Sequence, residues 1–256
     1  MTPRRLEMLA LVRQAHQRQT RNNGRVPYWM HVQSVAQILE WVIERDDEIG
    51  DSMLREDLFL AALGHDLYED TEVTSSSIRE RFGERVDGWI RALTNDGDQD
   101  RAAYLDRILA APEEVKLIKL ADLLDNTASV AYGIHDLGVK WTGGTFLVIA
   151  SEMGAVMRAA RFERYPRTAD ALMSLFAFHH QRLIHAFEMH QEHAAAAARA
   201  KGGGPEVGPR TKPARHEISP EIWKRALERT RERERKEGER VFKGGKPFFI
   251  PDKDDD

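Results

Sequence analysis

The chain has 256 residues, of which 41% are hydrophobic and 31% are charged, and it contains no cysteine. This composition is typical of globular proteins. It excludes disulfide bonds and thiolate metal ligands, so a metal site would have to use nitrogen and oxygen donors. No apolar run approaches the roughly 18 residues of a membrane span, and the charged start of the chain lacks the apolar core of a signal peptide. We therefore expect no membrane partner and take a cytoplasmic location as the default.

The net charge of −4 is distributed unevenly along the chain. Residues 1–198 carry 22 Lys and Arg against 30 Asp and Glu, whereas residues 199–256 carry 16 against 12. A nucleic-acid surface needs a concentration of positive charge, so the acidic first part argues against a nucleic-acid partner.

Apolar residues recur at helical spacing along most of the chain, and neither strand alternation nor an internal repeat is present. A capping box at Ser77 and a proline at position 112 indicate two helix starts. The predicted helices, in chain order, cover residues 32–43, 58–67, 77–83, 86–93, 112 onward and 172–187. The fold is therefore predicted to be all-α, a helical bundle.

We divide the chain at residue 198. Residues 1–198 form the predicted helical body. Residues 199–256 begin as a linker that is rich in Gly and Pro up to Pro213 and continue as a charged helix from about Ser219 to Glu239. The acidic end is expected to be disordered.

Several acidic side chains gather where the second predicted helix ends. His65 and Asp66 close an apolar segment, and if the helix continues, Glu69 lies one turn beyond His65 and Asp70 one turn beyond Asp66. Three carboxylates in one place are unfavourable unless a cation or a proton offsets their charge. A divalent metal ion is the simplest such cation.

Two other helices supply further candidate ligands. The apolar stripe through Val115 and Ile118 continues at helical spacing to Asp122 and then to Asn126. A carboxylate on an inward face needs a partner, and the amide one turn further could bind a substrate oxygen. His31 begins the first apolar helix. The candidate ligands are two imidazoles and two carboxylates, a mixture that suits Mn²⁺, Fe²⁺ or Zn²⁺ and leaves positions for water and phosphate: His31, His65, Asp66 and Asp122.

The order His…His-Asp…Asp resembles that of the HD phosphohydrolase superfamily. The surrounding segments resemble the hydrolase domain of the Rel/SpoT alarmone enzymes, in the same order. These segments are residues 15–21 (AHQRQTR), 27–31 (PYWMH), 61–71 (AALGHDLYEDT), 82–86 (FGERV), 93–94 (LT) and 119–122 (KLAD) followed by Asn126. The resemblance fades after residue 126, and it implies an HD-domain helical bundle.

The same resemblance implies roles for individual residues. His31, His65, Asp66 and Asp122 would hold one divalent ion per chain, usually Mn²⁺. Glu69 and Asp70 would be the acid/base pair for the attacking water, with Asn126 beside them in the catalytic site. Arg21 and Asn126 would hold phosphates. Apart from the resemblance, Tyr28 could pack on the base or ribose of the substrate or be a core tyrosine with a satisfied hydroxyl.

The implied reaction removes the 3′-pyrophosphate of (p)ppGpp, which yields GDP or GTP. Residues 199–256 are too few and too polar for an alarmone synthetase domain, so we expect hydrolysis only. The expected partner is a small nucleotide, and association of identical chains is left open.

The chain departs from the family pattern near the substrate rather than at the metal. The loop between Arg21 and His31 is one residue longer, and Asn22 stands where a basic residue is common. Leu123 replaces an arginine, and Asp125 precedes the asparagine. These changes bear on base preference and on the number of phosphates bound.

Other interpretations remain open. The substrate could be (p)ppApp or the 2′-phosphate of NADPH, or the chain could be a non-catalytic nucleotide-binding HD module. A helical core with acids paired to arginines is the structural alternative. Arg21 could be a helix-end cation and Asn126 a helix C-cap. Residues 141–144 either close the pocket or form a turn. Five histidines are spread around the last helix and are expected to be solvated or core residues: His179, His180, His185, His190 and His193.

Overall fold

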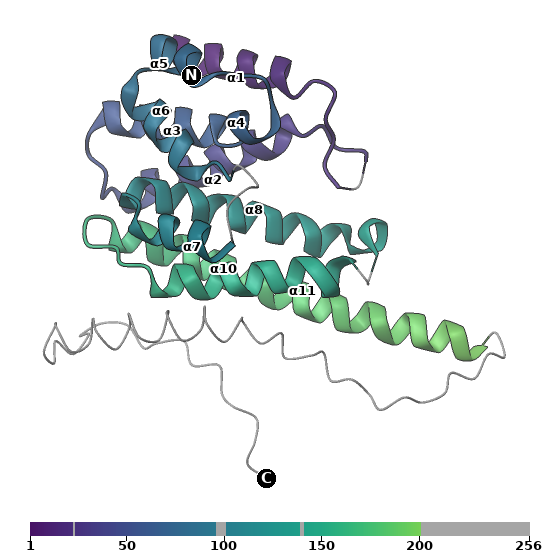
Figure 1. Cartoon of the computed structure of the whole chain (residues 1–256). Coiled ribbons are helices and arrows are strands. Elements are labelled where there is room, and N and C mark those ends of the chain that lie inside the picture. The colour runs from purple at the N-terminus through teal and green to yellow at the C-terminus, as the bar shows by residue number, and fades with distance from the viewer. Residues whose placement is uncertain (23, 96–100, 139–140, 201–256) are drawn as a thin grey trace, which may run out of the picture.

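The computed structural model describes residues 1–22, 24–95, 101–138 and 141–200, and the described part contains helices but no strand. The predicted all-α class is thus confirmed (Figure 1). The predicted linker, charged helix and acidic end lie outside the described residues from position 201 onward. None of the described helices has the length and apolarity needed to cross a bilayer.

The first group of helices makes up the N-terminal part of the body. Its members, in chain order, are α1 (Pro3–Ala15), α2 (Trp29–Asp46), α3 (Ser52–Gly64), the short α4 (Leu67–Asp70), α5 (Ser75–Phe82) and α6 (Glu84–Leu93). The second group consists of α7 (Arg101–Ala110), α8 (Glu113–Leu137), the π-helical segment η1 (Thr142–Phe146), α10 (Leu147–Ala159) and α11 (Pro166–Ala200).

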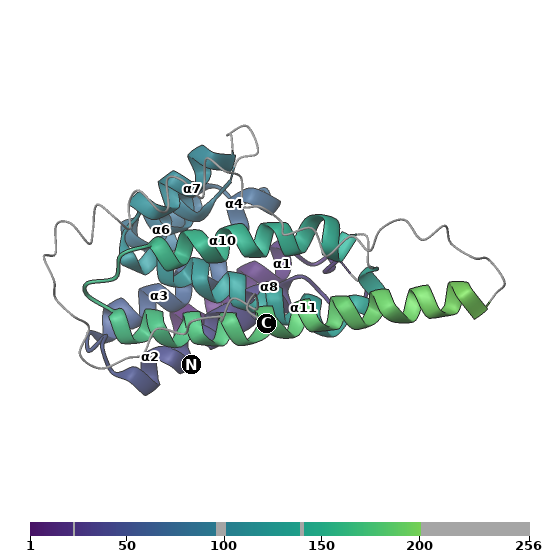
Figure 2. The same cartoon turned by 90° about the horizontal axis from the view of Figure 1, so that it is seen from below.

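Helix α8 is the central element, because it contacts α2, α3 and α6 on one side and α10 and α11 on the other (Figure 1). Most of its first three turns are buried, as expected of a helix that is surrounded by others. Figure 2 shows α10 and α11 side by side, with the end of α11 extending beyond the other helices. The predicted last helix is therefore confirmed but is longer than its apolar pattern, and it runs through the predicted boundary at residue 198.

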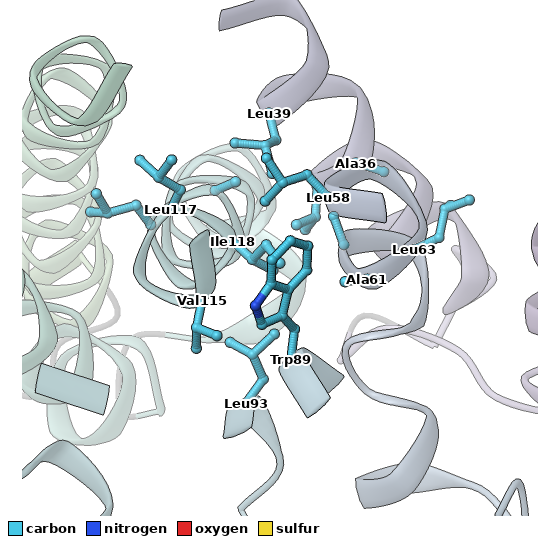
Figure 3. Close-up of a cluster of buried hydrophobic side chains, with 14 of the residues drawn as sticks. Ala36, Leu39, Leu58, Ala61, Leu63, Trp89, Leu93, Val115, Leu117 and Ile118 are labelled. Carbon is cyan, nitrogen blue, oxygen red and sulfur yellow. The ribbon is translucent and has the colours of Figure 1, made fainter. Parts of the chain in front are cut away.

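The main core lies between α2, α3, α6 and α8. Figure 3 shows Trp89 of α6 close to Leu58 of α3 and to Val115 and Ile118 of α8. Leu58, Val115 and Ile118 are fully buried. Burial of side chains of this size stabilises the fold by about 1.5–3 kcal/mol each, and it fixes the helices that carry the candidate ligands.

Two local predictions need correction. Helix α5 begins at Ser75, because Thr74 caps it by accepting the N–H of Ser77 at 3.4 Å, so the predicted start at Ser77 was too late. Residues 141–144 are not a turn, since η1 is helical from Thr142 onward. Glycine at position 143 allows close packing there: a Cβ atom would lie 2.2 Å from Cζ of Phe187 in α11.

Candidate metal centre and active site

Three helices and one helix junction bring the four predicted metal ligands together. His31 lies in the first turn of α2, His65 caps the end of α3, Asp66 precedes α4, and Asp122 lies on the inward face of α8. One donor atom each of His31, His65 and Asp122 lie within 4.8 Å of one another, and all three residues are buried. Oδ2 of Asp66 lies 3.0 Å from Nε2 of His65 and 3.6 Å from Nε2 of His31.

Nδ1 of each imidazole, which points away from the cluster of candidate ligands, already has a hydrogen-bond partner. Nδ1 of His65 lies 2.8 Å from the carbonyl oxygen of Ala62, and Nδ1 of His31 lies 2.7 Å from Oδ2 of Asp125. A carbonyl can only accept, so Nδ1 of His65 carries a proton, and Nε2 is the nitrogen that faces the two carboxylates. Such partners fix the tautomer of metal-binding histidines.

The surroundings of Nε2 of His65 are evidence for a metal ion at this place. Although Nε2 lies near two carboxylates, it makes no acceptable hydrogen bond within the described part of the chain. A buried polar atom without a partner costs about 1–3 kcal/mol. Ligation of a divalent cation would satisfy that nitrogen and offset the two acids, so the donor set fits the ion that the sequence predicts.

The pKa shifts within the cluster of candidate ligands also indicate that positive charge is needed there. Burial opposes the charged form of Asp122, but Lys119 and the two imidazoles outweigh it and hold the pKa of this carboxyl well below its usual value. Burial would lower the pKa of His65, but Asp66 and Asp122 raise it well above its usual range. The carboxylates therefore require positive charge beside them, which either protons on the imidazoles or a metal ion can supply.

The cluster opens onto a cavity of about 400 Å³. Its lining combines apolar side chains from α6, α7 and α10, here called the apolar wall, with the candidate ligands, Lys119 and Asn126, here called the floor. The lining residues are Tyr28, His31, His65, Asp66, Glu69, Leu93, Asn95, Tyr104, Leu105, Lys119, Asp122, Asn126, Ile149 and Met153. A cavity of this size suits a small-molecule ligand.

The helix is interrupted between Gly64 and Leu67, which changes the expected relation of Glu69 to His65. Helix α3 ends at Gly64, and α4 begins at Leu67. The imidazole of His65 occupies the Ala62 carbonyl, which in a continuous helix would accept the N–H of Asp66. The break falls between His65 and Glu69, so the one-turn spacing predicted for that pair does not come from a continuous helix, whereas Asp70 does lie one turn beyond Asp66, because its N–H donates to the Asp66 carbonyl oxygen at 3.0 Å.

Glu69 nevertheless lines the cavity, and its Oε2 accepts the backbone N–H of Asn95 at 2.9 Å. Burial of the carboxyl raises the pKa of Glu69, and the nearby Asp66 adds to the shift. Asp70 does not line the cavity. Burial and Asp66 also raise the pKa of Asp70.

The three predicted substrate-binding residues occupy different positions. Asn126 and Tyr28 line the cavity, and each donates to a candidate ligand: Asn126 Nδ2 to Asp122 Oδ1 at 2.6 Å, and the Tyr28 hydroxyl to Asp66 Oδ2 at 2.8 Å. Asn126 lies in the middle of α8 and is no helix C-cap. Arg21 does not line the cavity, because its guanidinium donates to Asp125 Oδ2 at 2.6 Å and to Asn126 Oδ1 at 2.9 Å.

The residue patterns did not reveal the roles of Lys119 and Asp125. Lys119 Nζ donates to Asp122 Oδ2 at 2.7 Å and lines the cavity, a placement that its position three residues before Asp122 could have indicated. Asp125 was noticed as a departure from the family pattern, but its contact with His31 depends on how α8 packs against α2 and has no signal in the sequence.

Acidic side chains elsewhere in the body pair with arginines, as the structural alternative expected, but the two candidate acidic ligands of the metal centre do not. Asp57 binds Arg4 and Arg85, and Asp87 binds Arg79 and Arg91. Asp66 and Asp122 instead face imidazoles and one lysine. The five histidines of α11 are half-buried or exposed, and among the described residues they form no group of three or more potential metal ligands.

Comparison with known proteins agrees with this geometry. Residues 9–133 match the family model described as "HD domain". Over 125 residues, or 46% of this chain, the sequence is 35% identical to a guanosine-3′,5′-bis(diphosphate) 3′-pyrophosphohydrolase of Aquifex aeolicus, of which the match covers 16%. Over 126 residues, or 47% of this chain, it is 30% identical to MESH1 of Drosophila melanogaster, which has the same enzyme name and is covered to 66%.

The chain thus spans less than two thirds of either relative. A solved structure described as a metazoan ortholog of SpoT that hydrolyses ppGpp superposes with a TM-score of 0.49 at 23% identity, over 74% of this chain and 97% of the other. The matched segment, residues 9–133, contains all four candidate ligands. Residues 9–133, just under half of the chain, are thus similar to the HD-domain family.

Proposed function

We propose that the chain hydrolyses guanosine 3′-diphosphate 5′-(di/tri)phosphate at the ribose 3′ position, releasing pyrophosphate and GDP or GTP, with one Mn²⁺ per chain as cofactor. The observation that carries the proposal is the convergence of two imidazoles and two carboxylates on a cavity of about 400 Å³, with Nε2 of His65 buried beside Asp66 and Asp122 and without a well-formed hydrogen bond in the described part of the chain. The enzyme name that both curated relatives carry supports this choice of substrate.

His31, His65, Asp66 and Asp122 would hold the ion. A divalent ion in such a site polarises a phosphoryl oxygen and lowers the pKa of bound water. The protein contributes the acid and the base. Glu69 lines the cavity with a raised pKa, so it can take a proton from an attacking water near neutral pH, and Asp70 is the second carboxyl proposed for this task.

Positive charge and amide groups at the floor would orient the pyrophosphate. Of the described side chains that line the cavity, Lys119 is the one with a permanent positive charge, and its ammonium can contact both Asp122 and a phosphate oxygen. Asn126, proposed for both catalysis and substrate binding, lies beside Asp122. We propose that Tyr28 borders the substrate and also orients Asp66 through its hydroxyl.

The base would lie against the apolar wall of Leu105, Ile149 and Met153. Apolar side chains contact any base and do not read its hydrogen-bonding edge. Together with Asn22 in place of a basic residue, they lead us to expect weaker discrimination between guanine and adenine than is usual in the family. We also expect no nucleic-acid partner, since the body is acidic.

Product analysis of the metal-stripped protein with ppGpp, ppApp and NADPH, each with and without added Mn²⁺, tests the proposal. We expect pyrophosphate and GDP from ppGpp in the presence of Mn²⁺, and a comparable reaction with ppApp. Release of phosphate from NADPH, with no reaction of ppGpp or ppApp, would favour the 2′-phosphatase alternative. Nucleotide binding without turnover would favour a non-catalytic binding module.

A further inference from the structure

Asp125 connects a metal ligand to a cation outside the cavity. Its Oδ2 lies 2.7 Å from Nδ1 of His31 and 2.6 Å from Nη1 of Arg21, so one carboxylate oxygen accepts from both groups. The side chains are 13% exposed for Asp125, 14% for Arg21 and 2% for His31, so the contacts are largely shielded from water. His65 has no such arrangement, because its Nδ1 binds the Ala62 carbonyl.

The other arm of the Arg21 guanidinium leads to a second metal ligand. Nη2 of Arg21 donates to Oδ1 of Asn126 at 2.9 Å, and Nδ2 of Asn126 donates to Oδ1 of Asp122 at 2.6 Å. The planar guanidinium thus holds two neighbouring residues of α8 in fixed positions, and those residues orient His31 and Asp122. A lysine could not make both contacts, since it lacks the forked donor geometry.

The backbone keeps Arg21 in this place. The N–H of Arg21 donates to the carbonyl oxygen of Val26 at 2.8 Å, and Thr20 and Pro27 form an isolated β-bridge beside it. The N–H of Gly24 donates to the carbonyl oxygen of Arg21 at 2.7 Å. Gly24 has a φ of 68°, a conformation that favours glycine. The loop that is one residue longer than the family pattern therefore closes on itself and presents Arg21 to α8.

Two of the five N–H donors of Arg21 are engaged by Asp125 and Asn126, and a phosphate that took their place would leave both acceptors without this donor. Loss of the arginine would leave the Asp125 carboxylate without its permanently charged partner beside the metal centre. We infer that Arg21 and Asp125 form an ion-pair brace that holds His31 in the tautomer and orientation needed for metal binding, and that Arg21 is a positioning residue and not a phosphate ligand. This inference rests on the metal centre of the proposed function.

The brace is tested by Mn²⁺ affinity without substrate, measured as free Mn²⁺ by electron paramagnetic resonance, in Arg21→Met, Asp125→Asn and the double variant. Each single change should weaken Mn²⁺ binding about 10–100-fold, the usual effect of removing a partner of a metal-binding histidine. The double variant should bind Mn²⁺ about as weakly as the single variant with the lower affinity, because both changes break the same Arg21–Asp125 ion pair. Arg25→Met is the matched control. Arg25 lies in the same loop and pairs with Asp136 at 3.5 Å, so its replacement removes a charge there and should leave the Mn²⁺ affinity unchanged.

Steady-state kinetics on ppGpp at saturating Mn²⁺ separate the two roles of Arg21. A positioning role predicts a lower kcat with KM within about threefold of wild type, whereas a phosphate ligand predicts a KM raised tenfold or more with Mn²⁺ affinity intact. The second pattern, or additive losses in the double variant, would overturn the inference. If Arg21→Met does not fold, Arg21→Lys retains the charge and should show a smaller loss of affinity. Absence of ppGpp turnover in the wild type would refute the proposed substrate and leave the Mn²⁺ measurements able to decide on the brace.

Discussion

Lys119 and Asp122 form an ion pair at the floor of the cavity, with Nζ of Lys119 2.7 Å from Oδ2 of Asp122. Both residues lie on α8, three positions apart, so the helix itself sets their separation. Asp122 thereby faces a lysine on one side and two imidazoles on the other. The ammonium is the one permanent positive charge that the described lining residues offer to an anionic substrate.

Lys119→Met should separate substrate binding from metal binding. Loss of the ammonium removes a contact with phosphate, so we expect KM for ppGpp to rise about tenfold, the effect of roughly 1.4 kcal/mol. Mn²⁺ should bind as tightly as in the wild type or more tightly, because a neighbouring positive charge is gone. Steady-state kinetics and Mn²⁺ titration measure the two effects. A large loss of Mn²⁺ affinity with unchanged KM would show that Lys119 only orients Asp122.

Glu69→Gln should impair the chemical step. The amide keeps the shape and the contact with the Asn95 N–H but cannot accept a proton, so kcat should fall by about two to four orders of magnitude with Mn²⁺ retained. The pKa of Glu69 is raised, mainly by burial, so wild-type kcat/KM should fall on the acid side at a higher pH than an exposed glutamate would give. Glu72→Gln, at an exposed position nearby, is the control. An unchanged kcat in Glu69→Gln would reject the role as base.

Packing between α10 and α11 should depend on Gly154. A Cβ atom there would lie 2.5 Å from Cε1 of Phe176, which is fully buried. Gly154→Ala should therefore lower the free energy of unfolding by about 1–3 kcal/mol, as overpacked cores do. Gly88→Ala in α6 is the opposite control, since nothing lies within 4 Å of its Cβ position, and it should stabilise by about 0.5–1 kcal/mol. Chemical denaturation of both variants measures the difference, and equal effects would contradict this packing.

His180 should make stability depend on pH. Burial, with a smaller contribution from Arg158, lowers the pKa of His180 to about 4, and its Nε2 lies 3.0 Å from Ser151 Oγ. The unfolded chain binds a proton near pH 6.5 and the folded chain does not, so stability is lost as pH falls from about 6.5 toward 4, by up to about 3 kcal/mol. His180→Gln should remove this part of the pH dependence. Parallel stability curves for the two proteins over that range would exclude the effect.

The parts of the site that follow from one helix were predictable from the sequence. The apolar stripe of α8 places Asp122 and Asn126 on one inward face, and the structure agrees because α8 is continuous there. The residue chemistry, supported by the resemblance, grouped His31, His65 and Asp66 with Asp122, and the geometry unites them.

Relations that depend on a helix break or on packing were not predictable. The side chain of His65 competes for the Ala62 carbonyl and ends α3, which interrupts the helical spacing between His65 and Glu69, although Asp70 keeps its one-turn distance from Asp66. Asp125 contacts His31 and Arg21 only because α8 packs against α2 and against the loop before it. Periodicity along one segment contains no information on such contacts.

The central claim is that one divalent ion, held by His31, His65, Asp66 and Asp122, is needed for hydrolysis at the ribose 3′ position. The most direct test is to titrate Mn²⁺ into the metal-stripped protein and into Asp66→Ala while pyrophosphate release from ppGpp is measured by chromatography. We expect wild-type activity to rise from baseline and to saturate at one ion per chain, with Asp66→Ala neither retaining the ion nor recovering activity. Full turnover in the stripped protein, or an Asp66→Ala variant that binds Mn²⁺ and hydrolyses ppGpp like the wild type, would contradict the account.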